Sequence, residues 1–479
     1  MLKGFEHVQH VVVLMLENRS FDHLFGFLYS GEQRPKHFLP PHSTSEFNGM
    51  PRSFSNPSNP EFFSASRSAA EVSADDVKVR IGAEDRCIPR QNPQERFEHV
   101  NLQLFGTTQP AAGQQPSMNG FVISYADKHP ERGAEIMQCY APEQLPTFSA
   151  LAYNFAICDE WYSSAPTQTW PNRAFFHTGT SMGQVDDYPY DPYAYDTPTI
   201  FNVLTERKIR WAVYNDSHIT SSTRLQFPQL WDLLLEPHFQ NLEAFEGDAR
   251  SGNLPAYAFL EPSFLIEPND AHPPHDMLLA DQLVWRVWRA VSTGAHWDST
   301  LLLITFDEHG GCVDHQPPPY GSVPPDERRA ANGFAFDRYG VRVPMIAVSP
   351  WLEAGTVFRS PGDRPYDHTS VLATLRDWLE IPSGAMLKSH RVESAPTLGH
   401  LLTRSEPRKE IPAIPFPTGK ATKHHLGLAA NDFQKGLMIS FAHRVGLRGG
   451  VKLLEHVHHR QHIADFFESH RERHQRDRG

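Results

Sequence analysis

Two apolar runs in this sequence end in polar residues that are good ligands for a metal ion. Glu17 and Asn18 follow the run from Val11 to Met15, and Asp307 and Glu308 follow a second run of the same kind. Carboxylate and amide oxygens suit a hard cation such as Mg²⁺ or Ca²⁺, whereas added histidines would favour Zn²⁺ or Mn²⁺. We therefore expect a divalent ion, of one of these four kinds, with Glu17, Asn18, Asp307 and Glu308 as its ligands.

A third segment offers a nucleophile at the start of a helix. Pro171 fits the first turn of a helix that continues through Asn172 and Arg173, which places Thr169 at or just before its amino end. A hydroxyl there faces unpaired backbone N–H groups and the positive end of the helix dipole, so its phosphorylated form would be stabilised. Alternatively, Thr169 only caps the helix. Arg173 could bind two phosphate oxygens or form a surface ion pair.

Histidines could supply protons or further ligands to the same site. A tight glycine turn follows the second acidic pair, and Asp314 and His315 come next, within reach of the same rim. His275 and His368 lie near the ends of predicted elements. Imidazole titrates near neutral pH and can act as an acid, a base or a ligand, although a lone histidine is more often structural. We keep these three histidines, with Asp314, as candidates for the site.

The elements that would position these residues alternate between strands and helices. Ser20 fits the N-cap of a helix that follows the first strand. Further strand-like runs begin at Ile209, Ala256, Thr300 and Val341, and helical patterns cover residues 148–162, 278–294 and 368–381. This alternation predicts an α/β fold in which a mostly parallel central sheet is flanked by helices. Such sheets carry their chemistry at the carboxyl ends of their strands, where the polar residues above are expected.

Composition excludes some classes of protein. The chain has 479 residues, 39% of them apolar and 21% charged, with a net charge of −12, which predicts a soluble globular protein that binds no nucleic acid. It has no apolar run long enough for a transmembrane helix, and no signal peptide precedes the first strand. A mature form, another export route or an intracellular protein would fit equally. The four cysteines form no CxxC pair and predict no disulfide framework.

Two regions depart from the alternating pattern. Residues 31–116 are rich in Ser, Pro and Asn with weak periodicity, which indicates an insertion or lid over the site. Residues 406–479 form a C-terminal extension, a linker followed by helices, so we expect a catalytic domain over residues 1–405. Phe433, Leu437 and Phe441 give this tail an apolar stripe that could dock on the catalytic domain, join subunits into an oligomer or touch a membrane. Its many histidines indicate a solvated helix rather than a metal site.

A tyrosine-rich loop is the candidate for recognition of a lipid headgroup. Tyr188, Tyr190 and Tyr193 stand among aspartates, and with Trp161 they could surround a quaternary ammonium group such as choline. Alternatively, this is a surface loop with tyrosines packed beneath it.

Several of these segments together resemble a known family. They are ENRSFDHLFG from Glu17, TWPNR from Thr169, DEHGGCVDHQPPP from Asp307, VRVPMIAVSPW from Val341 and DHTS from Asp367. In sequence and order they are similar to the phosphoesterase family of bacterial and plant non-specific phospholipases C and related acid phosphatases, over about residues 8 to 400. The resemblance implies an alkaline phosphatase-like sandwich fold.

The resemblance also implies a mechanism and a substrate class. Thr169 would attack phosphorus beside the metal ion and form a phospho-threonine that water then cleaves. His315 or His275 would protonate the departing oxygen, and Asn172 and Arg173 would hold the phosphate oxygens. His368 would be a ligand of a second metal site or a hydrogen-bonding partner of phosphate, with Asp314 in a similar supporting place.

The implied activity is that of a phospholipase C. It would hydrolyse phosphatidylcholine-type phospholipids, at a membrane or micelle surface, to diacylglycerol and a phosphorylated headgroup. The alternatives are an acid phosphatase acting on phosphomonoesters and, less favoured, a non-catalytic phospholipid-binding protein. A sulfatase is disfavoured because the sequence contains no Cys-x-Pro-x-Arg segment.

Overall fold

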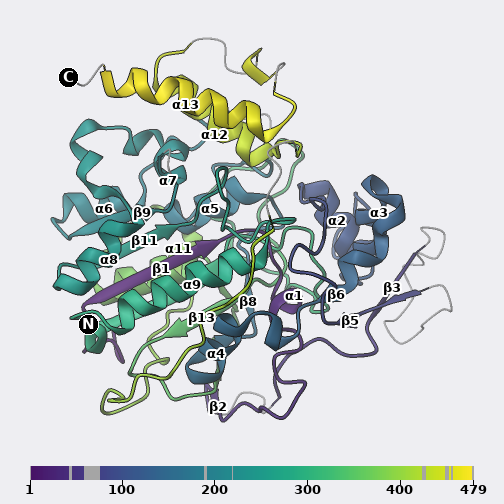
Figure 1. The fold of residues 1–479 in the computed structure, drawn as a ribbon, viewed down its shortest axis with the longest axis horizontal. Helices are drawn as coiled ribbons and strands as arrows, with labels where there is room; N and C mark the ends of the chain where they lie inside the picture. The colour runs from purple at the N-terminus through teal and green to yellow at the C-terminus, as the bar shows by residue number, and fades with distance from the viewer. Residues whose placement is uncertain are drawn as a thin grey trace.

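The protein is an α/β structure built on one large sheet (Figure 1). The computed structural model describes residues 2–41, 46–58, 76–187, 191–217, 220–422, 428–447, 452–454 and 457–476. In the order in which they pair, the strands are β10 (Phe239–Asn241), β9 (Trp211–Asn215), β11 (Tyr257–Glu261), β1 (His10–Leu16), β12 (Thr300–Phe306), β13 (Met345–Val348), β7 (Ala156–Cys158), β14 (Thr356–Phe358) and β2 (His37–Leu39). The expected mostly parallel sheet is confirmed.

The helices surround this sheet and extend beyond it. They are α1 (Phe21–Phe25), α2 (Phe97–Phe105), α3 (Phe121–Lys128), α4 (Pro146–Asn154), α5 (Thr169–Thr178), α6 (Ile200–Glu206), α7 (Ser222–Gln226), α8 (Leu242–Ser251), α9 (Met277–Ser292), α10 (Thr369–Trp378), α11 (His390–Ser394), α12 (Asp432–Arg444) and α13 (Arg460–Arg476).

The register of the central strands brings the predicted site residues together. β1 lies between β11 and β12 and is parallel to both, and Leu16 is paired with Phe306 at the end of the β1–β12 ladder. Glu17 and Asp307 therefore leave neighbouring strands at the same level. β13 alone among the described strands of this sheet runs against its neighbours. The carboxyl ends of β11, β1 and β12 form one edge, as the sequence predicts.

Both faces of the sheet are covered, which explains why every residue of β1 and β12 is buried. α9 packs against β1 and β12, and α4 packs against β7 and β13. In Figure 1, α9 crosses in front of the sheet. α5 and α6 pack on β11, where Phe176 lies 5.6 Å from Phe259 and Phe201 lies 5.9 Å from Tyr257, between ring centroids. Because α5 is pressed onto β11 in this way, its amino end is held near the ends of the central strands.

One predicted helix is too long. The helical pattern over residues 148–162 ends at Asn154, and β7 follows at once, paired with β13 and β14. Trp161 and Tyr162 form β8, which pairs with β15 (Tyr366–Asp367). The run Ala-Ile-Cys is apolar and buried, so its pattern fits a helix or a strand equally. It forms a strand because β13 and β14 each offer it an edge to pair with.

The region of weak periodicity is packed rather than loose where the structure describes it. β2 forms the edge of the main sheet, β3 (Ser55–Pro57) pairs with β4 (Asp76–Lys78), and β5 (Arg80–Ile81) pairs with β6 (Gln138–Cys139). α2 packs on α3, and the two helices share a second apolar core with Met50 and Phe54. The region therefore has a core of its own beside the main one.

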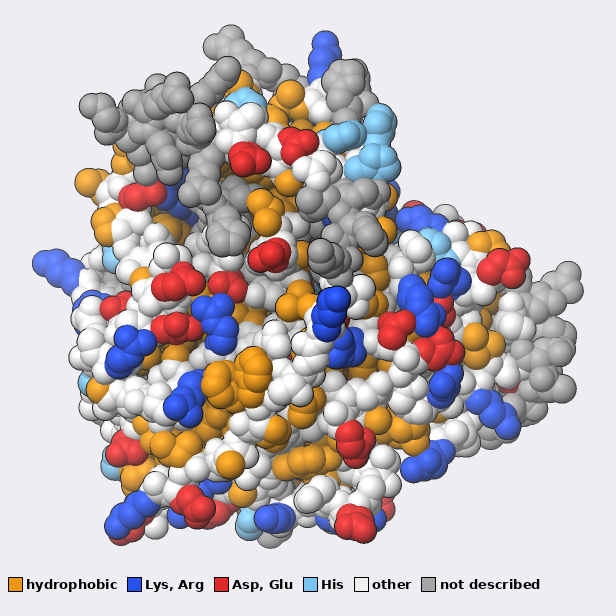
Figure 2. All heavy atoms as spheres, viewed as in Figure 1, with side chains coloured by type: hydrophobic (Ala, Val, Ile, Leu, Met, Phe, Trp, Pro, Cys, Tyr) orange, Lys and Arg blue, Asp and Glu red, His pale blue; other side chains and the backbone are white. Residues whose placement is uncertain are grey.

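The tail folds back onto the rest of the chain. α12 contacts α7, α13 contacts α12, and both lie above the sheet at the top of Figure 1. Phe433, Leu437 and Phe441 are all buried within the chain. Of the three predicted roles for this stripe, docking on the same chain is the one that accounts for its burial. None of the described helices is both long and apolar enough to cross a membrane. The face shown in Figure 2 mixes acidic and basic side chains.

Candidate active site

Asn18 is the residue around which the candidate site is arranged. It follows β1 with a φ of 59°, a left-handed conformation that Asn tolerates better than most residues. Its backbone N–H donates to Asp307 Oδ1 at 3.1 Å, and its Nδ2 donates to Glu308 Oε1 at 2.5 Å and Glu95 Oε2 at 2.8 Å. Its Oδ1 accepts a hydrogen bond of 3.4 Å from Thr169 Oγ1. One side chain thus joins the ends of β1 and β12 to the predicted nucleophile.

A glycine pair lets the loop after β12 approach this closely. Gly310 and Gly311 have φ values of 60° and 68°. A Cβ on Gly310 would lie 2.3 Å from the carbonyl oxygen of Asn18, and one on Gly311 would lie 2.6 Å from that of Gln94. Any larger residue would push this loop away from Asn18.

Thr169 is the first residue of α5, as the sequence predicts, and it is 1% exposed. The Asp187 carboxylate accepts from the Trp170 backbone N–H at 2.8 Å, at the amino end of the helix. Asn172 holds the preceding loop, since its side chain bonds the backbone of Ala165 and the backbone and hydroxyl of Thr167. Asn172 therefore positions the loop that presents Thr169, and its expected contact with phosphate stays a prediction.

Arg173 lies among the carboxylates beyond Thr169. Its Nε donates to Asp307 Oδ2 at 3.1 Å, and its Nη2 is 3.4 Å from Glu17 Oε1. Its buried Nη1 has no hydrogen-bond partner. That N–H group could donate to an oxygen of a bound phosphate, and this expected role of Arg173 stays a prediction.

The carboxylates carry more negative charge than Arg173 balances. Burial raises the pKa of Glu17, an effect that the charge of Asp307 increases and Arg173 opposes. Burial and the charge of Asp307 also raise the pKa of Glu308. Glu17 Oε1 is buried and makes no hydrogen bond, although Arg173 is near it. An unpaired carboxylate oxygen among buried acids fits a divalent cation, so the donor set expected from the sequence suits the metal.

The loop after β11 adds a second group of polar residues. The backbone oxygen of Asp270 accepts from the Glu17 N–H at 2.7 Å, so this loop lies directly against the end of β1. Asp270 Oδ1 lies 2.5 Å from His275 Nδ1. His275 Nε2 is hydrogen-bonded to Arg460 Nη1 of α13. Because an arginine can only donate, Nε2 is the acceptor and the ring proton is on Nδ1.

His272 is a further histidine in this loop. Its Nδ1 lies 2.6 Å from the Pro273 oxygen, and its Nε2 lies 3.1 Å from Nδ2 of Asn431, at the start of α12. Burial lowers the pKa of His272 to about 3, so the ring is neutral at ordinary pH.

His315 belongs to a different cluster. Its Nδ1 is 2.5 Å from Asp22 Oδ2, and Arg342 Nη2 lies 3.0 Å from both Asp22 Oδ1 and Asp314 Oδ1. Asp22, Asp314 and His315 are close enough together to hold a metal ion, but Arg342 already supplies positive charge there. The contacts of His315 and Asp314 are thus with α1 and Arg342, and they do not join these two residues to Thr169.

His368 is hydrogen-bonded to the backbone just after the end of β12. Its Nε2 is 2.5 Å from the backbone oxygen of Asp307, and Trp161 Nε1 donates to its Nδ1 at 3.4 Å. Both ring nitrogens are used, so His368 holds Asp307 in place. Its expected roles, as a ligand of a second metal site or a hydrogen-bonding partner of phosphate, stay predictions.

The predicted headgroup residues do not come together in the described part of the chain. Trp161 is fully buried and stacked on Tyr366, and its expected place against a lipid headgroup stays a prediction. Tyr193 is 54% exposed and bonds His443 of α12 through its hydroxyl at 2.9 Å. Tyr188 and Tyr190 lie outside the described residues.

Sequence reasoning missed four residues of the site. They are Glu95, Asp270, His272 and Arg460. Because His272 and His275 are spaced as HxxH, the selection of His275 could have pointed to His272 as well. Glu95 lies in the region without a motif and Arg460 in the tail, so each reaches the site only through tertiary packing.

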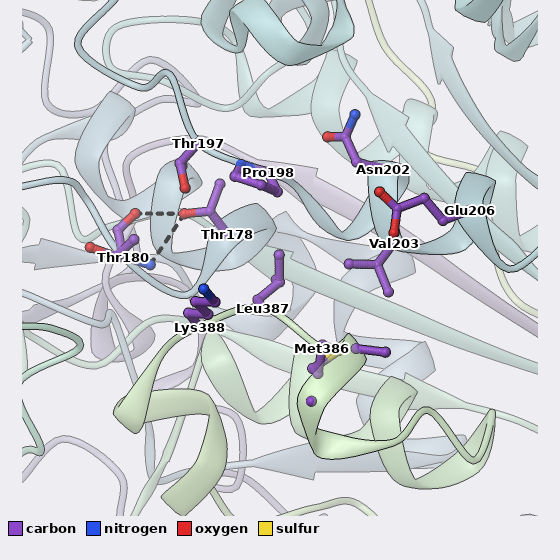
Figure 3. Close-up of a pocket in the computed structure, with 12 residues that line it drawn as sticks. Thr178, Thr180, Thr197, Pro198, Asn202, Val203, Glu206, Met386, Leu387 and Lys388 are labelled. Atoms are coloured by element: carbon purple, nitrogen blue, oxygen red, sulfur yellow. Dashed lines mark hydrogen bonds between the residues drawn. The ribbon is translucent and has the colours of Figure 1, made fainter.

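A separate cavity of about 360 Å³ opens at the other end of α5 (Figure 3). It is lined by residues that include Thr178, Thr180, Glu206, Met386 and Lys388. α5 rises about 1.5 Å per residue, so its ten residues place this cavity roughly 15 Å from Thr169. It is therefore distinct from the site described above.

Comparisons with known proteins found the following similarities. The model described as "Phosphoesterase family" matches residues 8–382. Non-specific phospholipase C1 of Arabidopsis thaliana is 32% identical over 85% of this chain and 73% of its own length. Phospholipase C B of Mycobacterium tuberculosis is 25% identical over 78% of this chain and 74% of its own. A crystal structure of a protein in the alkaline phosphatase superfamily from Vibrio parahaemolyticus is similar with a TM-score of 0.29 and 11% identity, over 48% of this chain and 59% of that one.

Proposed function

Because this chain belongs to the phosphoesterase family and is a phosphoric ester hydrolase, we propose that it is a phospholipase C acting on phosphatidylcholine-type lipids. The products would be diacylglycerol and the phosphorylated headgroup. The observation that carries the proposal is the hydrogen bond from Thr169 Oγ1 to Asn18 Oδ1. It lies where β1 and β12 end and their acidic residues follow. The relatives named non-specific phospholipase C support the choice of a lipid substrate.

Glu17, Asn18, Asp307 and Glu308 would hold a divalent cation beside Thr169. When bound, that cation would supply positive charge that lowers the pKa of a nearby hydroxyl and offsets charge on the phosphate. Arg173 would donate its unpaired Nη1 to a phosphate oxygen. His368 would fix Asp307 through the backbone of that residue.

Thr169 would act as the nucleophile. Its Oγ1 gives its proton to solvent and forms a bond to phosphorus while the bond from phosphorus to the diacylglycerol oxygen breaks, which leaves a phospho-threonine diester. The departing oxygen takes a proton from His275 Nε2, after Nε2 has parted from Arg460 and taken a proton from solvent. Water then gives a proton to the same nitrogen and attacks phosphorus while the bond from phosphorus to Thr169 Oγ1 breaks. Oγ1 takes a proton from solvent, and the phosphorylated headgroup leaves. We assign the acid to His275 rather than to His315 because its loop contacts Glu17 directly.

The test compares wild type with Thr169→Ala and Thr169→Ser on phosphatidylcholine vesicles. Diacylglycerol and phosphorylated headgroup would be measured with the metal-stripped enzyme and after addition of Ca²⁺, Mg²⁺, Zn²⁺ or Mn²⁺. Thr169→Ala should lower the rate by at least about 10³-fold, whereas Thr169→Ser keeps a hydroxyl and part of the rate. Normal diacylglycerol release by Thr169→Ala would refute the mechanism. Turnover of phosphomonoesters alone would favour an acid phosphatase.

A further inference from the structure

We propose that Arg460, at the start of α13, is a phosphate-binding residue of the catalytic site, so that the C-terminal tail supplies part of the catalytic machinery. The inference rests on the function proposed above and deepens it. Arg460 lies beyond residues 8–382, where the family model matches. Neither the sequence motifs nor the match to the family points to this residue.

The first observation is the condition of the Arg460 side chain. The residue is 3% exposed, its Nη1 donates to His275 Nε2, and its buried Nε has no hydrogen-bond partner. Burying a guanidinium with an unmet donor costs free energy that an anionic partner would recover. The nearby acid is Asp270, whose Oδ1 bonds His275 and whose buried Oδ2 makes no hydrogen bond, so it does not accept from Arg460. A phosphate oxygen would give the free N–H group an acceptor, in the fork geometry that suits arginine.

The second observation is that the tail segment that carries Arg460 contacts the site at other points as well. The tail also contacts the site through Asn431, which bonds His272, and through Phe433, whose ring centroid lies 5.1 Å from that of Trp170. Trp170 is the neighbour of Thr169 in α5. The tail thus contacts both the loop after β11 and α5, and its Arg460 lies beside the histidine that would serve as the acid.

These contacts give Arg460 a role that changes when substrate binds. With Arg460 on Nε2, His275 cannot carry the proton that the departing oxygen needs. A phosphate oxygen that accepts from Arg460 would draw the guanidinium off Nε2. Nε2 can then take a proton from solvent and pass it to the departing oxygen. No covalent bond to Arg460 forms or breaks, and only its hydrogen-bond partner changes.

The experiment compares Arg460→Ala and Arg460→Lys with wild type. We expect Arg460→Ala to lower kcat/KM for p-nitrophenyl phosphorylcholine by about 100-fold. Arg460→Lys should lose about tenfold, because an ammonium keeps the charge but not the fork. Added guanidinium should partly restore Arg460→Ala, while ethylammonium should not. Arg444→Ala is the matched control, since Arg444 lies in the same tail but is ion-paired with Glu236, and its activity should stay near wild type.

Three results would overturn the inference. Unchanged kcat/KM in Arg460→Ala would remove the role in phosphate binding, and increased kcat/KM would make Arg460 an inhibitory latch. A loss that guanidinium does not restore, with a lowered Tm, would make the residue merely structural. Failure of the proposed function looks different, because the wild-type protein would then hydrolyse no phosphoester or would not need Thr169.

Discussion

At the scale of single residues, the structure separates two histidines that the sequence leaves equivalent. His275 sits on the loop that contacts Glu17, whereas His315 is bonded to Asp22 beside Arg342. We expect His275→Asn to lower kcat by about 10² to 10⁴-fold, because it removes a general acid and base. His315→Asn should leave kcat close to wild type and lower the free energy of unfolding by about 1–3 kcal/mol, because Asp22 loses a buried partner.

Steady-state kinetics together with urea unfolding would measure both effects. The assignment would be wrong if His315→Asn lost the activity while His275→Asn kept it. Because both histidines are native and each bonds one carboxylate, each variant serves as the control for the other.

A second prediction at this scale concerns the glycine turn after Glu308. In Gly310→Ala, the new Cβ would meet the Asn18 carbonyl oxygen at 2.3 Å on a backbone with positive φ. We expect a loss of more than about 2 kcal/mol in stability, and loss of activity, because Asn18 must shift. Gly321→Ala is the control, since Gly321 also has positive φ but no atom within 4 Å of the added Cβ. It should cost about 1 kcal/mol and keep full activity.

The residues that could be predicted from the sequence are those that follow strong local patterns. Glu17, Asn18, Asp307 and Thr169 each stand at the end of an apolar strand or the start of a helix, and the structure brings them into one network. Roles that depend on side-chain partners were not readable in this way. The Asn172 side-chain amide, for example, is hydrogen-bonded to the loop that precedes α5. Nothing in the spacing of TWPNR distinguishes such a bond from a contact with phosphate.

At the scale of elements, a buried carboxylate links two helices. Asp281 of α9 accepts from the backbone N–H groups of Thr147 and Phe148 in α4, at 3.2 and 2.9 Å. Burial raises its pKa from 3.8 to about 7, against the effect of these two bonds. The folded protein therefore holds this proton more tightly than the unfolded chain does. The Asp281 contribution to stability is highest below pH 4 and falls as pH rises toward 7.

Asp281→Asn removes this titration. The difference in Tm between Asp281→Asn and wild type should move in favour of the variant from about pH 4 to about pH 7 and stay level above that. Thermal unfolding across this pH range measures it, with the exposed Asp363→Asn as the control. A difference in Tm that is independent of pH would contradict the interpretation.

Element prediction succeeded where length and pattern agreed. β1, β12 and α9 match their predicted runs, because each is long and strongly apolar or amphipathic. The segment after Asn154 failed because a three-residue strand carries too little pattern to be told from the end of a helix. Its identity depends on β13 and β14, which begin about 190 and 200 residues later in the sequence.

At the scale of the whole molecule, the tail and the catalytic core share their packing. Phe433 of α12 is 1% exposed and packs on Trp170 and Phe264, with ring centroids 5.1 and 5.2 Å away. The Phe264 ring in turn lies under the Arg173 guanidinium, 5.2 Å from its centroid. The predicted division at residue 405 therefore separates two parts of the chain that meet beside Thr169. The sequence predicted that the tail has an apolar stripe, but it could not predict the surface on which that stripe packs.

We expect this shared packing to make the described core and tail unfold together. Phe433→Ala should lower the free energy of unfolding by about 3–5 kcal/mol, and activity should be lost at the same temperature as the fold, because the cavity opens beneath Trp170 and Phe264. Calorimetry and an activity assay after heating measure the two losses. Phe416→Ala is the control, because Phe416 is 48% exposed and its loss leaves no buried cavity. Two separate transitions, with Phe433→Ala shifting the smaller one alone, would show instead that the tail is an independent unit and that the catalytic core does not depend on it.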